Sequence, residues 1–574
     1  MIQKYLLKKS TSIFLTPNKN KTGLITQFGI RLHDTLSLFT FLSHCILFEC
    51  VPYIISGHKR ADPQLISCLL NLFTMSESKN WFNNRTWSLS GNKEKEFAEK
   101  ERQHADDPAA AAIIVFPTST LEVSQLLSNV DHRERAIAVV CGGHSSSNVA
   151  TWPSLDDNMR QRALILDMKH MSSMTVNNET REVTVGGGVL FRQLAETCAG
   201  AKCALPIGTG PTVGVAGYVL NGGISGYFGR RLGMLGQRVT KLEIVMANGD
   251  IRTLSSTSPR SVGGEEDDGD LFRACLGAGS AMGVVTSLTL MMEDESSFRT
   301  GGSLVFACSS KSTAKSFLTK ALSFMKDNVM LPSLASTSME IVTTSDFTVI
   351  CTLVFYDSFD GDPETFVAPL RQAAMELDIP IVADGVSSYK SWFDAASNLW
   401  GVIDGMKGDP LVRMDHCIGT EQIPSDEVLE FLLGRFFGSF LEKAPLTIIE
   451  IRTLGGAAMG GANGDRLLPT GNAKCCFFAD MIVSYDAATT TVEDKSSILA
   501  EVHGIIADAM KMRGRGLMVD FSGTHCQSDD PPALLPGGDE VFGGSENHDL
   551  VRSTKKKHDP SNRFRYHPFA RVLD

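Results

Sequence analysis

Short apolar runs alternate with amphipathic segments from Ala109 onward, and most changes of pattern fall at glycines, prolines or polar turns. AAAAIIVFP predicts a buried strand that ends at Pro117, and AIAVVCGGH predicts a second strand that leads into glycines. ALILDM (Ala163–Met168) and REVTVGGG (Arg181–Gly188) predict two further strands. Their short lengths and flanking glycines favour strands over helices.

Helices and a hairpin are predicted between and after these strands. Ser119–Glu122 has the capping-box pattern, in which the serine side chain meets a free N–H and the glutamate reaches back. VLFRQLAETCAG predicts a short helix closed by Gly200. VTKLEIVMANGDIRTLS predicts a hairpin around Asn248–Gly249, a pair that tolerates the positive φ of a type I′ turn. We therefore expect an α+β arrangement for this region.

The chain beyond residue 293 has the pattern of a second domain. TAKSFLTKALSFM predicts a helix, whereas LTIIEIRTL and KCCFFADMIVSYD predict apolar strands. We expect this domain to span 293–540 and to contain an antiparallel sheet covered by helices. The tail, 541–574, is predicted to form a basic helix end, a turn stopped by proline and an aromatic, strand-like finish.

The first 74 residues differ from the rest of the chain. Thr35–Gly57 is apolar enough to suggest a membrane anchor, but His44, Glu49 and Pro52 interrupt it, and a charge near the bilayer centre is unfavourable by a few kcal/mol. We favour a disordered or dispensable extension, with Met75 as a plausible cytosolic start. The predicted location is the cytoplasm; a membrane-anchored or secretory protein is the alternative.

Composition narrows the class of protein. The chain has 574 residues, enough for two or more domains, and a formal net charge of -11. This charge argues against a nucleic-acid-binding protein, because phosphate contacts need clustered lysine and arginine. Its 13 cysteines are scattered without a CxxC pair, which favours free thiols in a reducing compartment. No metal-site spacing is present.

Three glycine-rich segments carry the candidate chemistry. In CGGHSSSN (Cys141–Asn148), two glycines let the backbone approach an anion, and successive N–H groups and serine hydroxyls can cradle a diphosphate. GTGPTVGVAGYVLNGGISGYFG (Gly208–Gly229) holds eight glycines in 22 residues, which suggests backbone packed against a flat ligand or, equally, a packed series of glycine turns.

The third segment, GAGSAMGVVTSLTLM (Gly277–Met291), is similar to a dinucleotide-binding fingerprint but departs from it. Its GxGxxxG spacing is one residue too long, and an apolar strand follows where the fingerprint opens a helix. We therefore reject a Rossmann interpretation.

Taken in order, GGH, PTVGVAG…LNGG, DLFRACLGAG…GVVT and, in the tail, HDPSNRF resemble the flavoproteins of the berberine bridge enzyme and 6-hydroxynicotine oxidase family. The resemblance covers about Pro108 to Met292 and resumes near the C-terminus. It implies an FAD-binding domain of the PCMH type over 108–292, in two α/β subdomains, followed by the substrate domain. The tail would return to the FAD domain.

The resemblance also implies which residues contact FAD. His144 occupies the position of the histidine that the family attaches covalently to the flavin. Gly210 stands where doubly linked members have a cysteine, so we predict a single link at most. Val213 lies where the family controls oxygen access, and its type favours an oxidase. The remaining implied contacts are Gly142, Gly143, Ser145, Ser146, Pro211, Thr212, Gly214, Gly217, Asn221, Gly222, Val285 and Asn562.

The catalytic half departs from the family pattern. Val140 stands where many members have an arginine, and Met518 and Asp520 stand where many have a tyrosine and an asparagine. Candidate bases are Asp480 and Tyr485 in one predicted strand and Glu450 in another. Glu450 and Arg452 have period-two spacing and share a strand face, where they either face the flavin or pair with each other.

These observations predict an FAD-dependent oxidoreductase that takes hydride from a small alcohol, amine or specialised metabolite and passes electrons to oxygen. A flavin dehydrogenase or oxidative cyclase of secondary metabolism, with another electron acceptor, is the alternative. A flavin-binding protein with little catalysis is a further alternative, because the arginine and the tyrosine–asparagine pair are missing.

Overall fold

The protein is described by a computed structural model. It describes residues 113–129, 135–144, 163–258, 268–278, 281–325, 337–344, 346–356, 359, 361–398, 400, 411–420, 427, 440–444, 447–458, 477–486, 490–511, 517–519, 537–542, 544–565 and 573.

A small parallel sheet opens the described part of the chain. Strands β1 (Ile113–Val115), β3 (Ala163–Asp167) and β2 (Ala136–Val140) pair in that order. Helix α6 (Thr120–Ser128) follows β1 and buries Val123 and Leu127 in the same apolar cluster as the sheet. Ser119 Oγ accepts from Glu122 N, as predicted, but the Glu122 carboxylate accepts from Thr118 N at 2.7 Å.

A second sheet is antiparallel, in the order β4-β5-β9-β7-β8. These strands and the helices of the same segment are β4 (Met174–Asn177), β5 (Glu182–Gly186), α8 (Phe191–Gly200), α9 (Val215–Leu220), α10 (Gly229–Leu232), β7 (Val239–Val245), β8 (Ile251–Ser255), α11 (Asp268–Cys275) and β9 (Val284–Met291). Strand β9 forms the second half of the third glycine segment, where a Rossmann fingerprint would open a helix.

Two local expectations in this segment were wrong in detail. The β7–β8 connection is not a type I′ turn, because Gly249 has a φ of +92° but Asn248 is not among the residues with positive φ. Helix α8 ends with Gly200 as its last helical residue, and Lys202 adopts the left-handed conformation with a φ of 55°. In the hairpin only the second of the two expected residues, Gly249, has a positive φ, and after α8 the left-handed residue is Lys202 and not Gly200.

An eight-stranded antiparallel sheet forms the next part of the molecule, in the order β14-β11-β13-β12-β16-β17-β15-β18. Its strands are β11 (Phe298–Ala307), β12 (Thr337–Thr344), β13 (Thr348–Tyr356), β14 (Ile381–Asp384), β15 (Leu411–Thr420), β16 (Ile448–Thr453), β17 (Phe477–Asp486) and β18 (Leu517–Val519). The associated helices are α12 (Lys311–Phe324), α13 (Pro363–Glu376), α14 (Trp392–Ala396), α17 (Phe440–Lys443) and α19 (Val492–Lys511).

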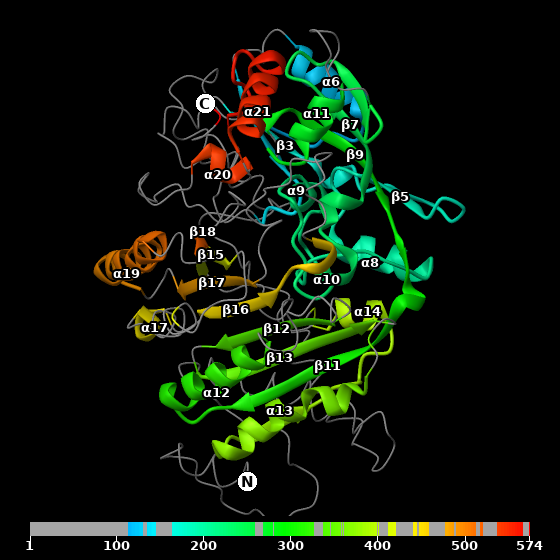
Figure 1. Ribbon diagram of the computed structural model, residues 1–574. Coiled ribbons are helices and arrows are strands. Elements are labelled where there is room, and N and C mark those ends of the chain that lie inside the picture. The colour runs from blue at the N-terminus through cyan, green and yellow to red at the C-terminus, as the bar shows by residue number, and fades with distance from the viewer. Residues whose placement is uncertain are drawn as a thin grey trace, which may run out of the picture. The chain divides into compact units, whose positions relative to one another are not determined.

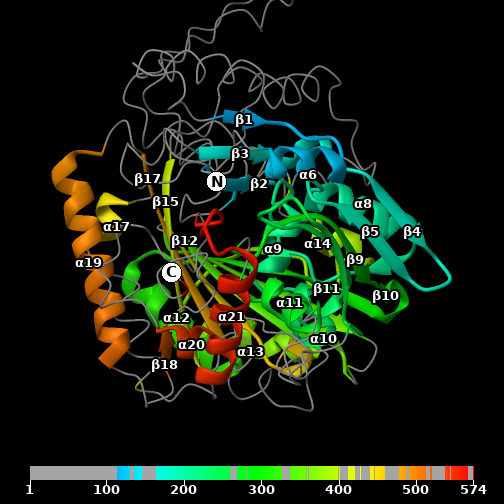
Figure 2. The same cartoon turned by 90° about the horizontal axis from the view of Figure 1, so that it is seen from above.

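The two faces of this sheet have different partners. One face carries Ile341, Leu353 and Ile451, which pack with side chains of α12, α13 and α19 in a single buried cluster. Figure 1 shows α12 and α13 beside β11 and β13, and Figure 2 shows α17 beside α19. On the other face, Val354 and Tyr356 join the buried cluster that also contains residues of the five-stranded antiparallel sheet β4-β5-β9-β7-β8. The predicted antiparallel sheet covered by helices, and the α+β class, are confirmed.

The C-terminal helix α21 (Ser545–His558), preceded by α20 (Gly538–Phe542), ends in a buried ion pair. Lys555 Nζ lies 2.6 Å from Asp559 Oδ2 and also donates to the carbonyl oxygens of Ala281 and Phe564. Arg563 N and Phe564 N both donate to the Asp559 carboxylate. These residues therefore connect the C-terminal segment to the loop before β9, as Figure 1 shows for α21 and α11.

The N-terminal prediction cannot be compared with this architecture. The expected extension, 1–74, with its apolar run Thr35–Gly57, lies outside the described residues. Within the described ranges, none of the helices combines the length and the apolar character that a bilayer crossing requires. The boundaries at 108–292, 293–540 and 541–574 stay predictions.

Breaking the Lys555–Asp559 pair should destabilise the protein strongly. In Lys555→Met the Asp559 carboxylate stays buried without its cation, and we expect a loss of about 3–5 kcal/mol in the free energy of unfolding. Denaturant unfolding followed by circular dichroism measures the loss. Lys556→Met, on the exposed side of the same helix, should change it by less than about 0.5 kcal/mol. Equal effects of the two variants would contradict the role of the ion pair.

Candidate functional site

The two glycine segments predicted to contact FAD lie directly against each other. A Cβ placed on Gly142 would lie 2.3 Å from Gly214 N and 2.4 Å from Thr212 O. A Cβ on Gly214 would lie 2.4 Å from Cys141 Sγ. Only glycine fits at these two positions, because the atoms in the way belong to backbone or to the partly buried Cys141. The GGH loop after β2 and the loop before α9 therefore form one unit.

This contact places His144 beside the second loop. His144 Nε2 and Thr212 Oγ1 are 2.8 Å apart, a hydrogen bond whose donor depends on the imidazole tautomer. A Cβ on Gly210 would lie 3.9 Å from His144 Cε1 and 2.9 Å from Val213 Cγ2. The positions that the resemblance assigns to the single link, the absent second link and oxygen access are thus neighbours.

Cys141 packs against the GGH loop and the loop before α9. Its thiol lies 3.6 Å from the carbonyl oxygen of Val189, and burial raises the pKa of the thiol to about 12. A thiol with so high a pKa is protonated and unreactive near neutral pH. Cys141 therefore has a packing role at the contact between the two loops.

Helix α9 carries the next predicted contacts. Gly217 is exposed, and a Cβ there would meet no atom within 4 Å, so this part of the helix has open space in front of it. Asn221 Nδ2 donates to Gly217 O at 2.8 Å, and its Oδ1 is buried without a partner among the described residues. Gly222 follows with a φ of +96°.

The other predicted FAD contacts are more dispersed. Gly143 has a φ of +68°, and Pro211 O accepts from Arg192 N. Val285 is 5% exposed in β9. Asn562 has a φ of 48°, and its Oδ1 is also buried without a partner in the described part of the chain. Ser145 and Ser146 lie outside the described residues.

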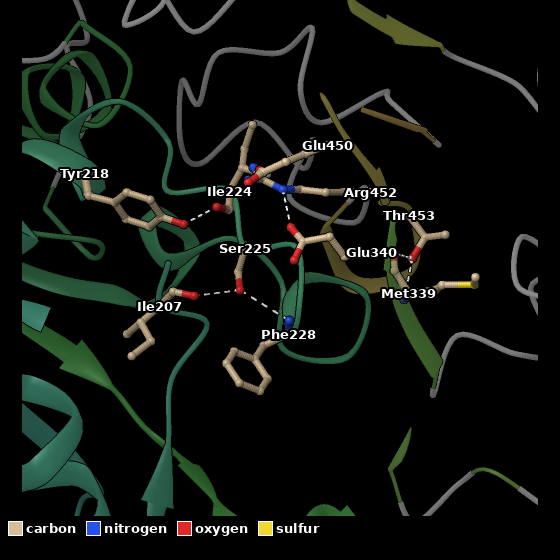
Figure 3. A network of polar contacts seen from close by, with 10 residues as sticks. All are labelled: Ile207, Tyr218, Ile224, Ser225, Phe228, Met339, Glu340, Glu450, Arg452 and Thr453. Carbon is tan, nitrogen blue, oxygen red and sulfur yellow. Dashed lines mark hydrogen bonds and ion pairs between the residues drawn. The ribbon is translucent and has the colours of Figure 1, made fainter. Parts of the chain in front are cut away.

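A network of charged groups on the eight-stranded sheet meets the second glycine segment (Figure 3). Arg452 Nε donates to Glu340 Oε1 at 2.6 Å, and Arg452 also forms an ion pair with Glu450. A Cβ on Gly226 would lie 2.8 Å from both Arg452 Cδ and Glu340 Oε1. Glu450 and Arg452 therefore pair with each other, and their strand face is also the one that meets the predicted flavin segment.

Tyr218 connects helix α9 to this network. Its hydroxyl donates to the carbonyl oxygen of Ile224, and burial raises the pKa of the phenol, with opposing effects from Arg452 and Glu340. Ser225 Oγ donates to Ile207 O at 2.8 Å and accepts from Phe228 N, which fixes the same loop. The hydroxyl of Tyr218 stays protonated near neutral pH.

The strand register shows which candidate bases share a face of the large sheet. Glu450 is the register partner of position 480, so these two positions share a face of the sheet. Position 485 is five residues further along β17, and β17 pairs without a bulge, so it belongs to the opposite face. That face carries Val483, which is buried in the helix-covered cluster. The register therefore favours Glu450 and Asp480 over Tyr485.

Glu340 was missed by the sequence interpretation. It is 2% exposed in β12, within the otherwise unremarked run TSMEIVTT. Its partner Arg452 is 112 residues away in sequence. The available signal was one charged residue in an apolar strand, which indicates a buried partner but does not identify it.

The donor chemistry of this region fits FAD. The two loops present glycine backbone and open space at Gly217, and Asn221 and Asn562 each keep a buried amide oxygen without a partner. Backbone N–H groups and small residues suit a diphosphate, whereas buried amide groups suit a ring system rich in hydrogen-bonding atoms.

Comparisons with known proteins agree with this assignment. The family described as FAD binding domain matches residues 111–255. An FAD-linked oxidoreductase of Aspergillus terreus, tazG, is 29% identical over 36% of this chain and 39% of its own length. (R)-6-hydroxynicotine oxidase of Paenarthrobacter nicotinovorans is 28% identical over 27% of this chain and 30% of its own length. The matches thus span about two fifths or less of these relatives.

The fold extends the likeness beyond the matched segment. The solved structure of BBE-like 1 from Physcomitrella patens superposes with a TM-score of 0.61 at 17% identity, covering 88% of this chain and 99% of that one. At this identity the likeness concerns the fold alone. Residues 111–255 therefore match an FAD-binding domain, and the chain as a whole has the fold of the solved BBE-like 1 structure.

Proposed function

We propose that the protein is an FAD-dependent oxidase whose flavin is linked covalently through His144. The observation that carries this proposal is the contact between the two glycine loops, which places His144 against Thr212 and beside Gly210. Bound FAD supplies a two-electron acceptor that takes hydride from a carbon atom. A single link agrees with glycine, in place of cysteine, at position 210.

The residues around His144 have separate roles in this proposal. Gly142 and Gly143, with Ser145 and Ser146 after them, bind the diphosphate through backbone N–H groups and hydroxyls. The exposed helix position Gly217 lies against the flat ring. The remaining predicted contacts hold the ring or its ribityl chain: Gly210, Pro211, Thr212, Val213, Gly214, Asn221, Gly222, Val285 and Asn562.

The substrate domain supplies the group that accepts a proton from the substrate. Glu450 and Asp480 are the candidates, because their positions are register partners on the face that meets the flavin segment. Tyr485 is not retained as a candidate, since its position belongs to the helix-covered face. The substrate is a small alcohol, amine or specialised metabolite, and molecular oxygen is the final acceptor.

A dehydrogenase or oxidative cyclase is the second candidate function. The same fold supports such enzymes. Val140, Met518 and Asp520, which differ from the residues of many family members, instead motivate a third candidate, a flavin-binding protein with little catalysis. The six free cysteines among the described residues support the predicted reducing, cytoplasmic location.

Replacing His144 should convert bound flavin from acid-stable to acid-labile. We expect wild-type protein to keep yellow flavin on acid denaturation and His144→Ala to release it, because the ring then lacks its covalent bond. Absorbance of the separated protein and supernatant measures the outcome. His170→Ala, at an exposed histidine, serves as the control and should keep the flavin. Flavin that wild-type protein releases in acid would refute the covalent link alone.

Thr212 should govern how fast that bond forms. Thr212→Val removes the hydrogen bond to His144 Nε2, worth about 0.5–1.5 kcal/mol, so attachment should slow by about 2- to 12-fold. Apoprotein is mixed with FAD and the acid-stable fraction is followed with time. Thr212→Ser keeps the hydroxyl and should react like wild type. An unchanged rate in Thr212→Val would show that the hydrogen bond does not orient the imidazole for attachment.

Oxygen should restore the flavin after reduction. A panel of alcohols, amines and sugars is screened anaerobically for bleaching of the flavin absorbance, and air is then admitted. We expect the absorbance to return and one hydrogen peroxide to form for each donor molecule oxidised. Samples without donor control for background peroxide. Reduced flavin that air leaves bleached but a dye reoxidises would favour the dehydrogenase.

A further inference from the structure

One guanidinium bridges two carboxylates on the face of the large sheet. Arg452 in β16 is the register partner of Glu340 in β12 and pairs with it at 2.6 Å. Arg452 also pairs through its Nη2 atom with Glu450, two residues earlier on the same strand. The exposed fractions of the three side chains are 16% for Arg452, 2% for Glu340 and 15% for Glu450, so the group is largely shielded from water.

This triad, Glu340–Arg452–Glu450, lies against the flavin segment. Gly226 leaves room for it, since any side chain there would overlap the Arg452 and Glu340 atoms. Arg230 Nη1 donates to Leu454 O at 2.5 Å, just beyond the end of β16. Thr453 Oγ1 bonds both Met339 N and Met339 O, which locks β16 to β12 at the same level (Figure 3).

The charges of the triad exceed what packing requires. In this triad one guanidinium is paired with two carboxylates. A buried ion pair contributes little net stability because desolvation offsets the attraction, and an additional buried carboxylate is unfavourable unless it has a purpose. The position opposite Glu450 in β17 is a further acidic residue, Asp480. The second carboxylate therefore indicates a chemical role.

We propose that Arg452 and Glu340 are positioning residues that fix the Glu450 carboxylate toward the flavin segment, and that Glu450 accepts the substrate proton. The planar guanidinium can hold two carboxylates in fixed directions, which a lysine does less well. Glu340, anchored in the sheet, fixes the guanidinium itself. The proposal rests on the proposed flavin oxidase function.

The reaction balances with these groups. A donor with a C–H bond next to an O–H or N–H group loses the carbon hydrogen as hydride to oxidised flavin. Its oxygen or nitrogen loses the proton to the Glu450 carboxylate, and the carbon–heteroatom single bond becomes a double bond. The donor is oxidised by two electrons and the flavin is reduced by two. A base displaced by about 1 Å slows such a step by up to about 100-fold.

Anaerobic stopped-flow reduction of the full, flavin-loaded protein tests the positioning role. The probe is the donor that bleaches the wild-type flavin fastest in the panel of alcohols, amines and sugars. Its concentration is varied to separate the limiting reduction rate from the dissociation constant. We expect Arg452→Met to lower the limiting rate by about 100-fold in the protein that retains flavin, and to lower the thermal midpoint because the buried Glu340 carboxylate loses its cation. Arg452→Lys should recover part of the rate, and Glu340→Gln should fall between.

Arg371→Met is the matched control. Arg371 also bridges two carboxylates, Glu364 and Asp384, but at the far edge of the same sheet, next to β14. Its loss should leave the reduction rate unchanged. An unchanged limiting rate in a folded Arg452→Met protein would overturn the proposal.

Failure to fold has its own interpretation. If Arg452→Met loses flavin or unfolds while Arg452→Lys and Glu340→Gln reduce like wild type, the triad is structural and the positioning role is wrong. If no donor in the panel reduces even the wild-type flavin, the oxidase proposal fails first and the positioning role falls with it. The wild-type result therefore separates the two failures.

Discussion

The position of His144 depends on the close approach of two backbone segments that tolerate no side chain between them. Gly142 and Gly214 meet with backbone atoms closer than a Cβ would permit. Next to them the partly buried Cys141 contacts Val189 O, and His144 Nε2 forms a hydrogen bond with Thr212 Oγ1. Helix α9 starts at Val215, the residue after Gly214, so the contact between the two glycines also fixes the position of its exposed residue Gly217. A larger residue at either glycine would separate the imidazole from the rest of the site.

The eight-stranded sheet has one face that packs against helices and one face that carries charged residues. Alternation along β16 sends Ile449 and Ile451 into the helix-covered cluster, whereas Glu450 and Arg452 belong to the other face. The buried side therefore holds the strand rigid while the polar side meets the flavin segment. A site on a strand packed in this way is held more precisely than one on a loop.

The flavin half of the site was accessible from the sequence because its signal is local. Glycines that admit a backbone contact are adjacent to the residues that use it, as in GGH and PTVG. The apolar runs predicted about half of the strands that the structure describes. The catalytic half was not accessible, because register decides it. Asp480 and Tyr485 looked equivalent in one strand, yet their odd separation puts them on opposite faces. Glu340 joined the site only because β12 pairs with β16, which no short sequence pattern encodes.

Two groups of buried charges in this molecule differ in a way that helps to distinguish a structural role from a catalytic one. In the C-terminal group, Lys555 Nζ has three oxygen partners and both Asp559 oxygens accept backbone N–H groups, so charges and hydrogen bonds balance. That is the arrangement expected of a structural clasp. In the Glu340–Arg452–Glu450 triad, a second carboxylate remains after the guanidinium has been neutralised, and it lies on the face that meets the flavin segment. A carboxylate on that face is placed to accept a proton, which is the role proposed for Glu450.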